Sequence, residues 1–147
     1  MPSTHTSLYF HLVFSTKNRQ RLITESIRGD LYGYLGGIAK NLGGVALAIG
    51  GIEDHVHMLI GLMASHRLDY FMRELKASSS GWVRRERDPE SSWQNGYGAF
   101  TVSSGNLDKV KGYIRNQAVH HKNKDFKTEY VELLELSGLE YDEKYLW

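Results

Sequence analysis

The stretch from His55 to Leu62 constrains the fold more than any other part of the sequence. Successive side chains of a β-strand point to opposite faces of a sheet, so a strand at this position has two different faces. One face is apolar and consists of every second residue: Val56, Met58, Ile60 and Leu62. The other face carries His55 and His57. The sequence therefore predicts a sheet in which one side is core and the other side carries imidazoles.

Strand and helix patterns alternate along the rest of the chain. The predicted elements are, in order, a strand at 8–15, a helix capped by Thr24 and ended by Gly43-Gly44, a strand at 45–52, the strand from His55, a helix from Ser65, a strand at 97–102, helices at 108–122 and from Phe126 to Gly138, and an extended end at 141–147. The order strand, helix, strand, strand, helix, strand is typical of the split βαβ or ferredoxin-like fold. We therefore expect an α+β antiparallel sheet with its first and third strands in the centre. Two helices would cover one face, and the histidine face would be open beside the helix that carries Tyr113.

A chain of 147 residues is expected to form a single domain, 1–147. The absence of cysteine excludes a disulfide framework and a cysteine zinc site, which leaves histidine and oxygen ligands for a metal. Residues 1–7 lack the pattern of a secretion signal, and no apolar run approaches the roughly 18 residues of a membrane-spanning helix. These features predict a soluble cytoplasmic protein with no membrane partner.

The formal net charge of +1 hides an uneven distribution. Residues 1–124 contain 16 Lys and Arg against 10 Asp and Glu, whereas residues 125–147 contain 2 against 7. A basic body suits a partner with a phosphate backbone. The acidic C-terminal helix and tail are typical of a solvated segment or of one that contacts a basic surface. The domain is therefore divided into a body, 1–124, and an acidic end, 125–147.

The spacing of His55 and His57 permits a metal site. Two imidazoles about 7 Å apart on one strand face can bind a single divalent cation. A polar face whose histidines are satisfied by hydrogen bonds is the alternative. Asp54 precedes the pair and could bind the same metal or orient an imidazole, although an aspartate in a turn needs no such role.

A second set of polar residues lies on the predicted helix at 108–122. Tyr113 and Gln117 are four residues apart on one face, and His120 follows one turn further on. A neighbouring apolar stripe consists of Val110, Ile114 and Ala118. This apolar stripe could pack the helix against a sheet. Tyr113 and Gln117 would then face the groups that lie beside the helix. A half-buried tyrosine with a glutamine neighbour is the structural alternative.

Three separated motifs resemble the IS200/IS605-like single-tyrosine transposases, a family of HUH endonucleases. The motifs are His55-Val56-His57, Trp93-Gln94-Asn95-Gly96-Tyr97-Gly98-Ala99-Phe100 and Tyr113-Ile114-Arg115-Asn116-Gln117. The similarity extends from the first strand, around Phe10 to Arg19, to Tyr145-Leu146-Trp147. Three motifs in the right order are more specific than any one of them, and together they span nearly the whole chain.

The resemblance implies an activity and a cofactor. In the family's scheme Tyr113 would be the catalytic nucleophile, and His55, His57 and Gln117 would bind Mg²⁺ or Mn²⁺. Asp54 and His120 are candidates for a supporting shell around the metal. Attack on a phosphodiester would give a 5′-phosphotyrosine link and a free 3′-hydroxyl, and a second strand could be joined without a nucleotide cofactor.

The resemblance also implies partners. The substrate would be single-stranded DNA folded into hairpins near the ends of a mobile element. A homodimer is expected because a complete cut-and-join needs two tyrosines, although REP-associated relatives include monomers, so assembly in cis or in trans stays open. Candidates for contacts with the DNA backbone are Lys17, Arg19, Arg73, Lys76, Arg84, Arg85, Lys111 and Arg115.

Other functions are compatible with parts of this pattern. A ferredoxin-like sheet with aromatic residues is also typical of catalytically idle nucleic-acid-binding modules. A relaxase or replication initiator of the wider HUH group would share the chemistry. A protein that uses the two histidines only structurally would show neither metal dependence nor a DNA-linked adduct. The intact set of His55, His57, Tyr113 and Gln117 favours the transposase.

Overall fold

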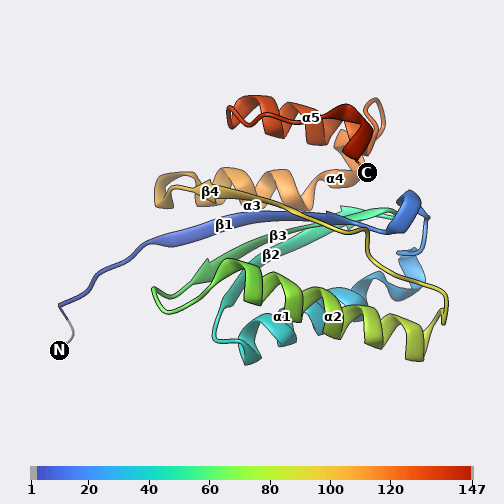
Figure 1. Ribbon diagram of the computed structural model, residues 1–147, viewed down its shortest axis with the longest axis horizontal. Coiled ribbons are helices and arrows are strands. Elements are labelled where there is room, and N and C mark those ends of the chain that lie inside the picture. Colours follow the sequence, from blue (N-terminus) through green and yellow to red (C-terminus); the bar gives the residue numbers. More distant parts are fainter. Residues whose placement is uncertain (1–2, 147) are drawn as a thin grey trace.

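The strand that carries the two histidines, β3 (His55–Leu62), is an inner strand of a four-stranded antiparallel sheet. The structure, a computed structural model, describes residues 3–146 (Figure 1). β3 pairs with β1 (Leu8–Ser15) on one side and β2 (Val45–Ile52) on the other, and β4 (Gly98–Val102) pairs with the outer side of β1. The order β2-β3-β1-β4 confirms the predicted ferredoxin-like α+β arrangement with the first and third strands in the centre.

Two helices, α1 (Glu25–Asn41) and α2 (Leu68–Glu86), cover one face of this sheet (Figure 1). The apolar side chains of β3 point to this face, as predicted, and pack with those of β1 and both helices. The core includes Leu12, Phe14, Leu31, Leu35, Val56, Met58, Ile60, Phe71, Met72 and Leu75. Burial of these side chains provides the main driving force for folding. No helix within residues 3–146 is long and apolar enough to cross a membrane.

The second face of the sheet lies under α3 (Leu107–Arg115), α4 (Gln117–His120) and α5 (Phe126–Leu136) (Figure 1). The prediction of one helix at 108–122 was wrong, because the backbone leaves the helical conformation at Asn116, with φ −98° and ψ 25°. Asparagine favours such a break, since its side chain competes with helical hydrogen bonds. The histidine face is also not open beside the Tyr113 helix as expected, because α5 covers it.

Several predicted ends differ from those observed. Thr24 precedes α1, but its side chain makes no capping hydrogen bond. The second helix begins at Leu68 rather than at Ser65. The chain end forms a 3-10 turn at Glu143–Tyr145 instead of an extended segment, and Trp147 lies outside the described residues. Helix ends depend on tertiary contacts that local sequence does not specify.

A close backbone contact seats α3 on the sheet. A Cβ atom added to Gly50 of β2 would clash with the carbonyl oxygen of Ile114. Ile114 itself is fully buried and packs with Ala48 and Leu59. Only glycine leaves room for this approach, so Gly50 sets the height of the Tyr113 helix above the sheet.

We expect Gly50→Ala to destabilise the protein by about 2 kcal/mol, because the added methyl group must push α3 away from β2. Gly33→Ala in α1 is the matched control, since no heavy atom other than those of the adjacent helix backbone lies within 4 Å of the added Cβ. Alanine at position 33 should instead stabilise the protein by about 0.5–1 kcal/mol. Urea unfolding measures both changes. A Gly50→Ala variant as stable as the wild type would contradict the packing of α3.

Candidate functional site

A neighbouring side chain holds each histidine of β3 at its Nδ1 nitrogen. His55 Nδ1 donates to Asp54 Oδ1 at 2.7 Å, and Asp54 stands in the turn between β2 and β3. His57 Nδ1 shares a 2.7 Å hydrogen bond with Nε2 of His11, which reaches it from β1. Neither His55 nor His57 is exposed to solvent. These contacts fix both rings and direct their Nε2 atoms to a common position.

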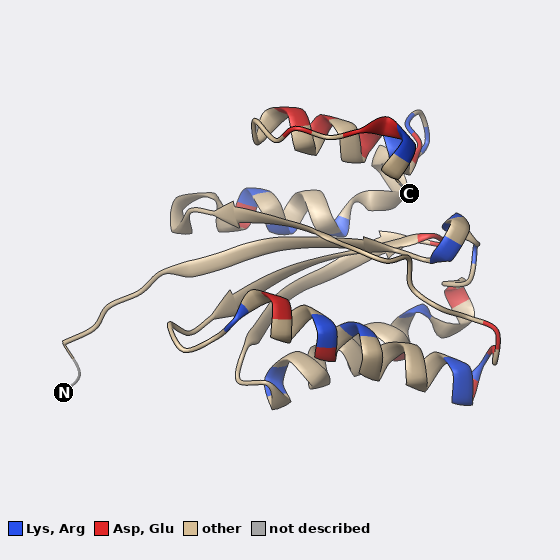
Figure 2. Cartoon of the chain, viewed as in Figure 1, with Lys and Arg blue, Asp and Glu red and all other residues tan. Residues whose placement is uncertain are grey.

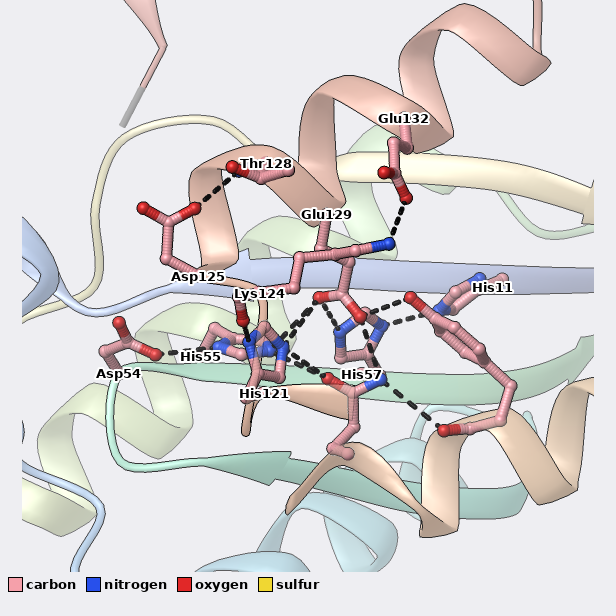
Figure 3. A network of polar contacts seen from close by, with 12 residues as sticks. His11, Asp54, His55, His57, His121, Lys124, Asp125, Thr128, Glu129 and Glu132 are labelled. Atoms are coloured by element: carbon pink, nitrogen blue, oxygen red, sulfur yellow. Dashed lines mark hydrogen bonds and ion pairs between the residues drawn. The ribbon is translucent and has the colours of Figure 1, made fainter. Parts of the chain in front are cut away.

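The carboxylate of Glu129, from α5, occupies this common position (Figure 3). Glu129 Oε1 lies 3.0 Å from His57 Nε2 and 3.4 Å from His55 Nε2. His121 Nε2, from the segment between α4 and α5, is 3.1 Å from the same oxygen. Glu129 is only 2% exposed, so its negative charge is stabilised by these donors rather than by water.

Tyr113 and Gln117 reach the second oxygen of the same carboxylate. The Tyr113 hydroxyl donates to Glu129 Oε2, and Gln117 Nε2 donates to it at 3.0 Å. Gln117 Oε1 accepts a hydrogen bond from His55 Nε2 at 3.0 Å. Tyr113 thus comes from α3 and Gln117 from α4, on either side of the break in the predicted helix.

Burial and hydrogen bonding shift several pKa values in this cluster. Burial disfavours the charged form of Glu129, but hydrogen bonds from His121, His55 and His57 outweigh it and hold the carboxyl pKa far below its usual range. Burial also disfavours the charged form of His55, but hydrogen bonds to two carboxylates and an amide outweigh this effect and raise its pKa to about 9. Burial lowers the pKa of His57 to about 4. Burial and the bond to Glu129 raise the pKa of Tyr113 well above its ordinary value, so its hydroxyl stays protonated in this arrangement.

The structure brings most of the predicted site residues together. Those within the hydrogen-bonded cluster are Asp54, His55, His57, Tyr113 and Gln117. His120 is exposed, and its ring contacts the Tyr113 ring in a tilted arrangement, with 4.7 Å between ring centroids and 35° between planes. The next residue, His121, enters the cluster instead. The break at Asn116 changes the helical register, so that His121 rather than His120 reaches the Glu129 carboxylate.

Sequence reasoning did not identify Glu129 or His121 as site residues. Glu129 lies on the stripe of α5 that packs against the sheet, beside Phe126 and Tyr130. A single carboxylate on an otherwise apolar helix face was the signal that could have identified it, because a buried carboxylate needs hydrogen-bond donors.

The predicted DNA contacts fall on both sides of the sheet. Four residues lie on the histidine side or at its edge, in the turn after β1 and on α3: Lys17, Arg19, Lys111 and Arg115. Four others lie on α2, on the opposite side (Figure 2): Arg73, Lys76, Arg84 and Arg85. Lys76 and Arg84 already donate hydrogen bonds to backbone carbonyls of the segment between α2 and β4. The first group therefore lies on the side of the sheet that carries the polar cluster, or at its edge, and the second group does not.

The ligand atoms of the cluster fit a divalent metal. One atom each of His55, His121 and Glu129 lie within 4.8 Å of one another. The predicted ligands His57 and Gln117 are hydrogen-bonded to the same carboxylate. Imidazole nitrogens together with carboxylate or amide oxygens suit Mn²⁺ or Zn²⁺, and Mg²⁺ where oxygens predominate.

Residues 4–117 match the sequence profile of a known family that is described as "Transposase IS200 like". The chain belongs to this family. The matched region contains β3 and extends to Gln117, so it ends before α5 begins at Phe126. A comparison with curated proteins found no match.

Two solved transposase structures are similar to this chain. A candidate transposase from Deinococcus radiodurans R1 is 26% identical, with a TM-score of 0.66, over 80% of this chain and 95% of the other. A REP-associated tyrosine transposase bound to a REP hairpin is 13% identical, with a TM-score of 0.61, over 82% of this chain and 74% of the other. The second likeness concerns the fold alone.

His11 is the hydrogen-bond partner of His57 Nδ1. A hydrogen bond to the ring nitrogen that does not bind the metal typically orients a metal-binding imidazole. We expect His11→Leu to weaken Mn²⁺ binding about 10–100-fold, because leucine leaves this nitrogen without its partner. His11→Gln is the matched control, since its amide can donate or accept at His57 and should retain most of the affinity. Calorimetric titration with Mn²⁺ measures binding, and thermal unfolding checks that both variants fold. Equal affinity in His11→Leu and wild type would contradict this role.

Proposed function

We propose that this protein is a metal-dependent single-stranded DNA transposase that cleaves and rejoins DNA through Tyr113. One observation carries the proposal: the Tyr113 hydroxyl and the Nε2 atoms of His55 and His57 converge on a single carboxylate. A nucleophile and candidate metal ligands can therefore act on one small anionic group. Membership of the IS200-like transposase family supports DNA as the substrate that supplies this group.

Tyr113 would supply the attacking atom. Its phenol oxygen bonds to phosphorus while the bond from phosphorus to the 3′-oxygen breaks, and the released 3′-oxygen takes up a proton. A phenol with a pKa of about 10 is a weak nucleophile at neutral pH, so it must lose its proton as it attacks. A divalent cation held by His55, His57 and Gln117 would supply positive charge against the charge that develops on the phosphate. Asp54 and His11 would keep the two imidazoles oriented.

The covalent link explains why joining requires no nucleotide cofactor. The 5′-phosphotyrosine retains the energy of the phosphodiester, so a second 3′-hydroxyl can attack it and release Tyr113. Joining two strand pairs needs two such tyrosines, which a homodimer would supply. The rings of Tyr113 and His57 lie 5.7 Å apart within one chain, which supports a site assembled in cis.

Hairpin-forming single-stranded DNA is the proposed substrate. A REP-associated relative with a similar fold was solved with a REP hairpin, which supports this class of DNA. Basic side chains at the edge of the site would contact the backbone, foremost Lys17, Arg19, Lys111 and Arg115. Binding that depends on phosphate contacts should weaken steeply as salt is raised.

We expect the protein to form a denaturation-resistant adduct with labelled single-stranded hairpin DNA from around its own gene, in the presence of Mn²⁺. Chelator should abolish the adduct, because the phosphate charge is then not neutralised. Tyr113→Phe should abolish it as well, whereas Tyr97→Phe should retain it, since Tyr97 lies outside the hydrogen-bonded cluster. Denaturing electrophoresis measures the adduct.

Two results would contradict the proposal in different ways. DNA binding without an adduct on any hairpin would indicate a catalytically idle binding protein. An adduct that persists in Tyr113→Phe would assign the chemistry to another nucleophile.

A further inference from the structure

The helix α5 closes the site that the proposed transposase would use. His55 and His57 have no solvent exposure, and Gln117 is 1% exposed. The ring of Phe126, at the start of α5, stacks on the ring of His55 with 4.2 Å between centroids and 20° between planes. A DNA strand cannot reach these groups while α5 occupies this position.

Glu129 supplies an anion where the proposed chemistry requires one. Its two oxygens accept hydrogen bonds from Tyr113, Gln117, His57 and His121, as Figure 3 shows for the labelled residues. A scissile phosphate would also have to present anionic oxygens between the Tyr113 hydroxyl and the β3 histidines. Carboxylate and phosphate oxygens accept the same charge-assisted hydrogen bonds, so the two groups compete for the same donors.

The contacts of α5 are separate from the main core. Its apolar side chains form a cluster of their own with two sheet residues: Val13, Phe100, Phe126, Tyr130 and Leu134. The segment 121–125 connects α5 to α4, and the main core between the sheet, α1 and α2 contains no residue of α5. Displacing α5 would therefore leave the main core intact.

Two further observations distinguish α5 from the rest of the site. The family match ends at residue 117, so the groups that would react lie inside the matched region and Glu129 lies outside it. The outer side of α5 and the tail beyond it are acidic (Figure 2), with Glu132 and Glu135 exposed. A docked α5 thus presents negative charge to DNA that approaches the site.

We infer that residues 121–136 form an autoinhibitory latch, in which Glu129 occupies the position of the scissile phosphate and α5 must leave the histidine face before DNA is cleaved. This inference rests on the proposed function. It explains why one buried carboxylate contacts both the nucleophile and the candidate metal ligands. The alternative is that Glu129 takes part in the reaction as a base or metal ligand, which predicts the opposite effect of removing its charge.

The test compares three full-length variants with the wild type in the adduct assay with hairpin DNA and Mn²⁺. Glu129→Gln removes the charge at the centre of the cluster. Leu134→Ala weakens the packing of α5 on the sheet and leaves every residue of the polar cluster unchanged. Glu135→Gln is the matched control, because it removes the same charge from α5 at an exposed position whose side chain contacts Tyr141 of the tail.

The latch predicts that Glu129→Gln and Leu134→Ala each form adduct at least about tenfold faster than the wild type, which corresponds to about 1.4 kcal/mol. Glu135→Gln should match the wild type. Slower adduct formation in Glu129→Gln, with an active wild type, would overturn the latch and place Glu129 in the reaction, while the proposed function would stand. No adduct from any of the four proteins would refute the proposed function and the latch with it.

Hydrogen exchange provides a readout that does not depend on cleavage. The backbone amides of α5 should exchange faster when Tyr113→Phe binds hairpin DNA, and also in Glu129→Gln without DNA, while those of α1 should not change. An α5 that stays fully protected in the DNA complex would overturn the latch.

Discussion

A buried carboxylate, Glu129, connects the sheet to all three helices above its histidine face. Moving a carboxylate out of water costs several kcal/mol unless donors surround it, and removing one donor leaves the charge uncompensated. The donors come from β3, α3, α4 and the segment before α5. The positions of these elements are therefore coupled, and the orientations of Tyr113 and the β3 histidines depend on one another.

The sheet and its apolar face could be predicted from the sequence because their signals are local. The two-residue alternation located β1 at residues 8–15, and it separated the core side of β3 from the histidine side. The strand predicted at 45–52 coincides with β2. Two features could not be predicted in this way. The break at Asn116 depends on tertiary packing and changes the helical register. As a result, His121 rather than His120 enters the cluster. The docking of α5 depends on contacts between residues 126–134 and distant strands, which no local pattern encodes.

The acidic and basic parts of the sequence occupy different places in the fold. The acidic end of the chain lies over the histidine face, and basic residues of the body lie at the edge of that face and on α2 (Figure 2). Arg19, after β1, interacts electrostatically with Asp125 at the start of α5. DNA that approaches the site would compete with this acidic segment for basic side chains such as Arg19. Added salt would weaken both sets of contacts, because it screens the charges of the DNA and of the acidic segment.

If Tyr113 forms the covalent link to DNA, tandem mass spectrometry of the adduct should identify it. After Mn²⁺-dependent reaction with a short hairpin, nuclease trimming and proteolysis, we expect a nucleotide phosphate on the peptide that contains Tyr113, with fragment ions that assign it to that residue. The same mass on a peptide with Tyr97 or Tyr130, or on no tyrosine, would refute the role of Tyr113. Such a result would leave the hydrogen-bonded cluster as a structural feature of the fold.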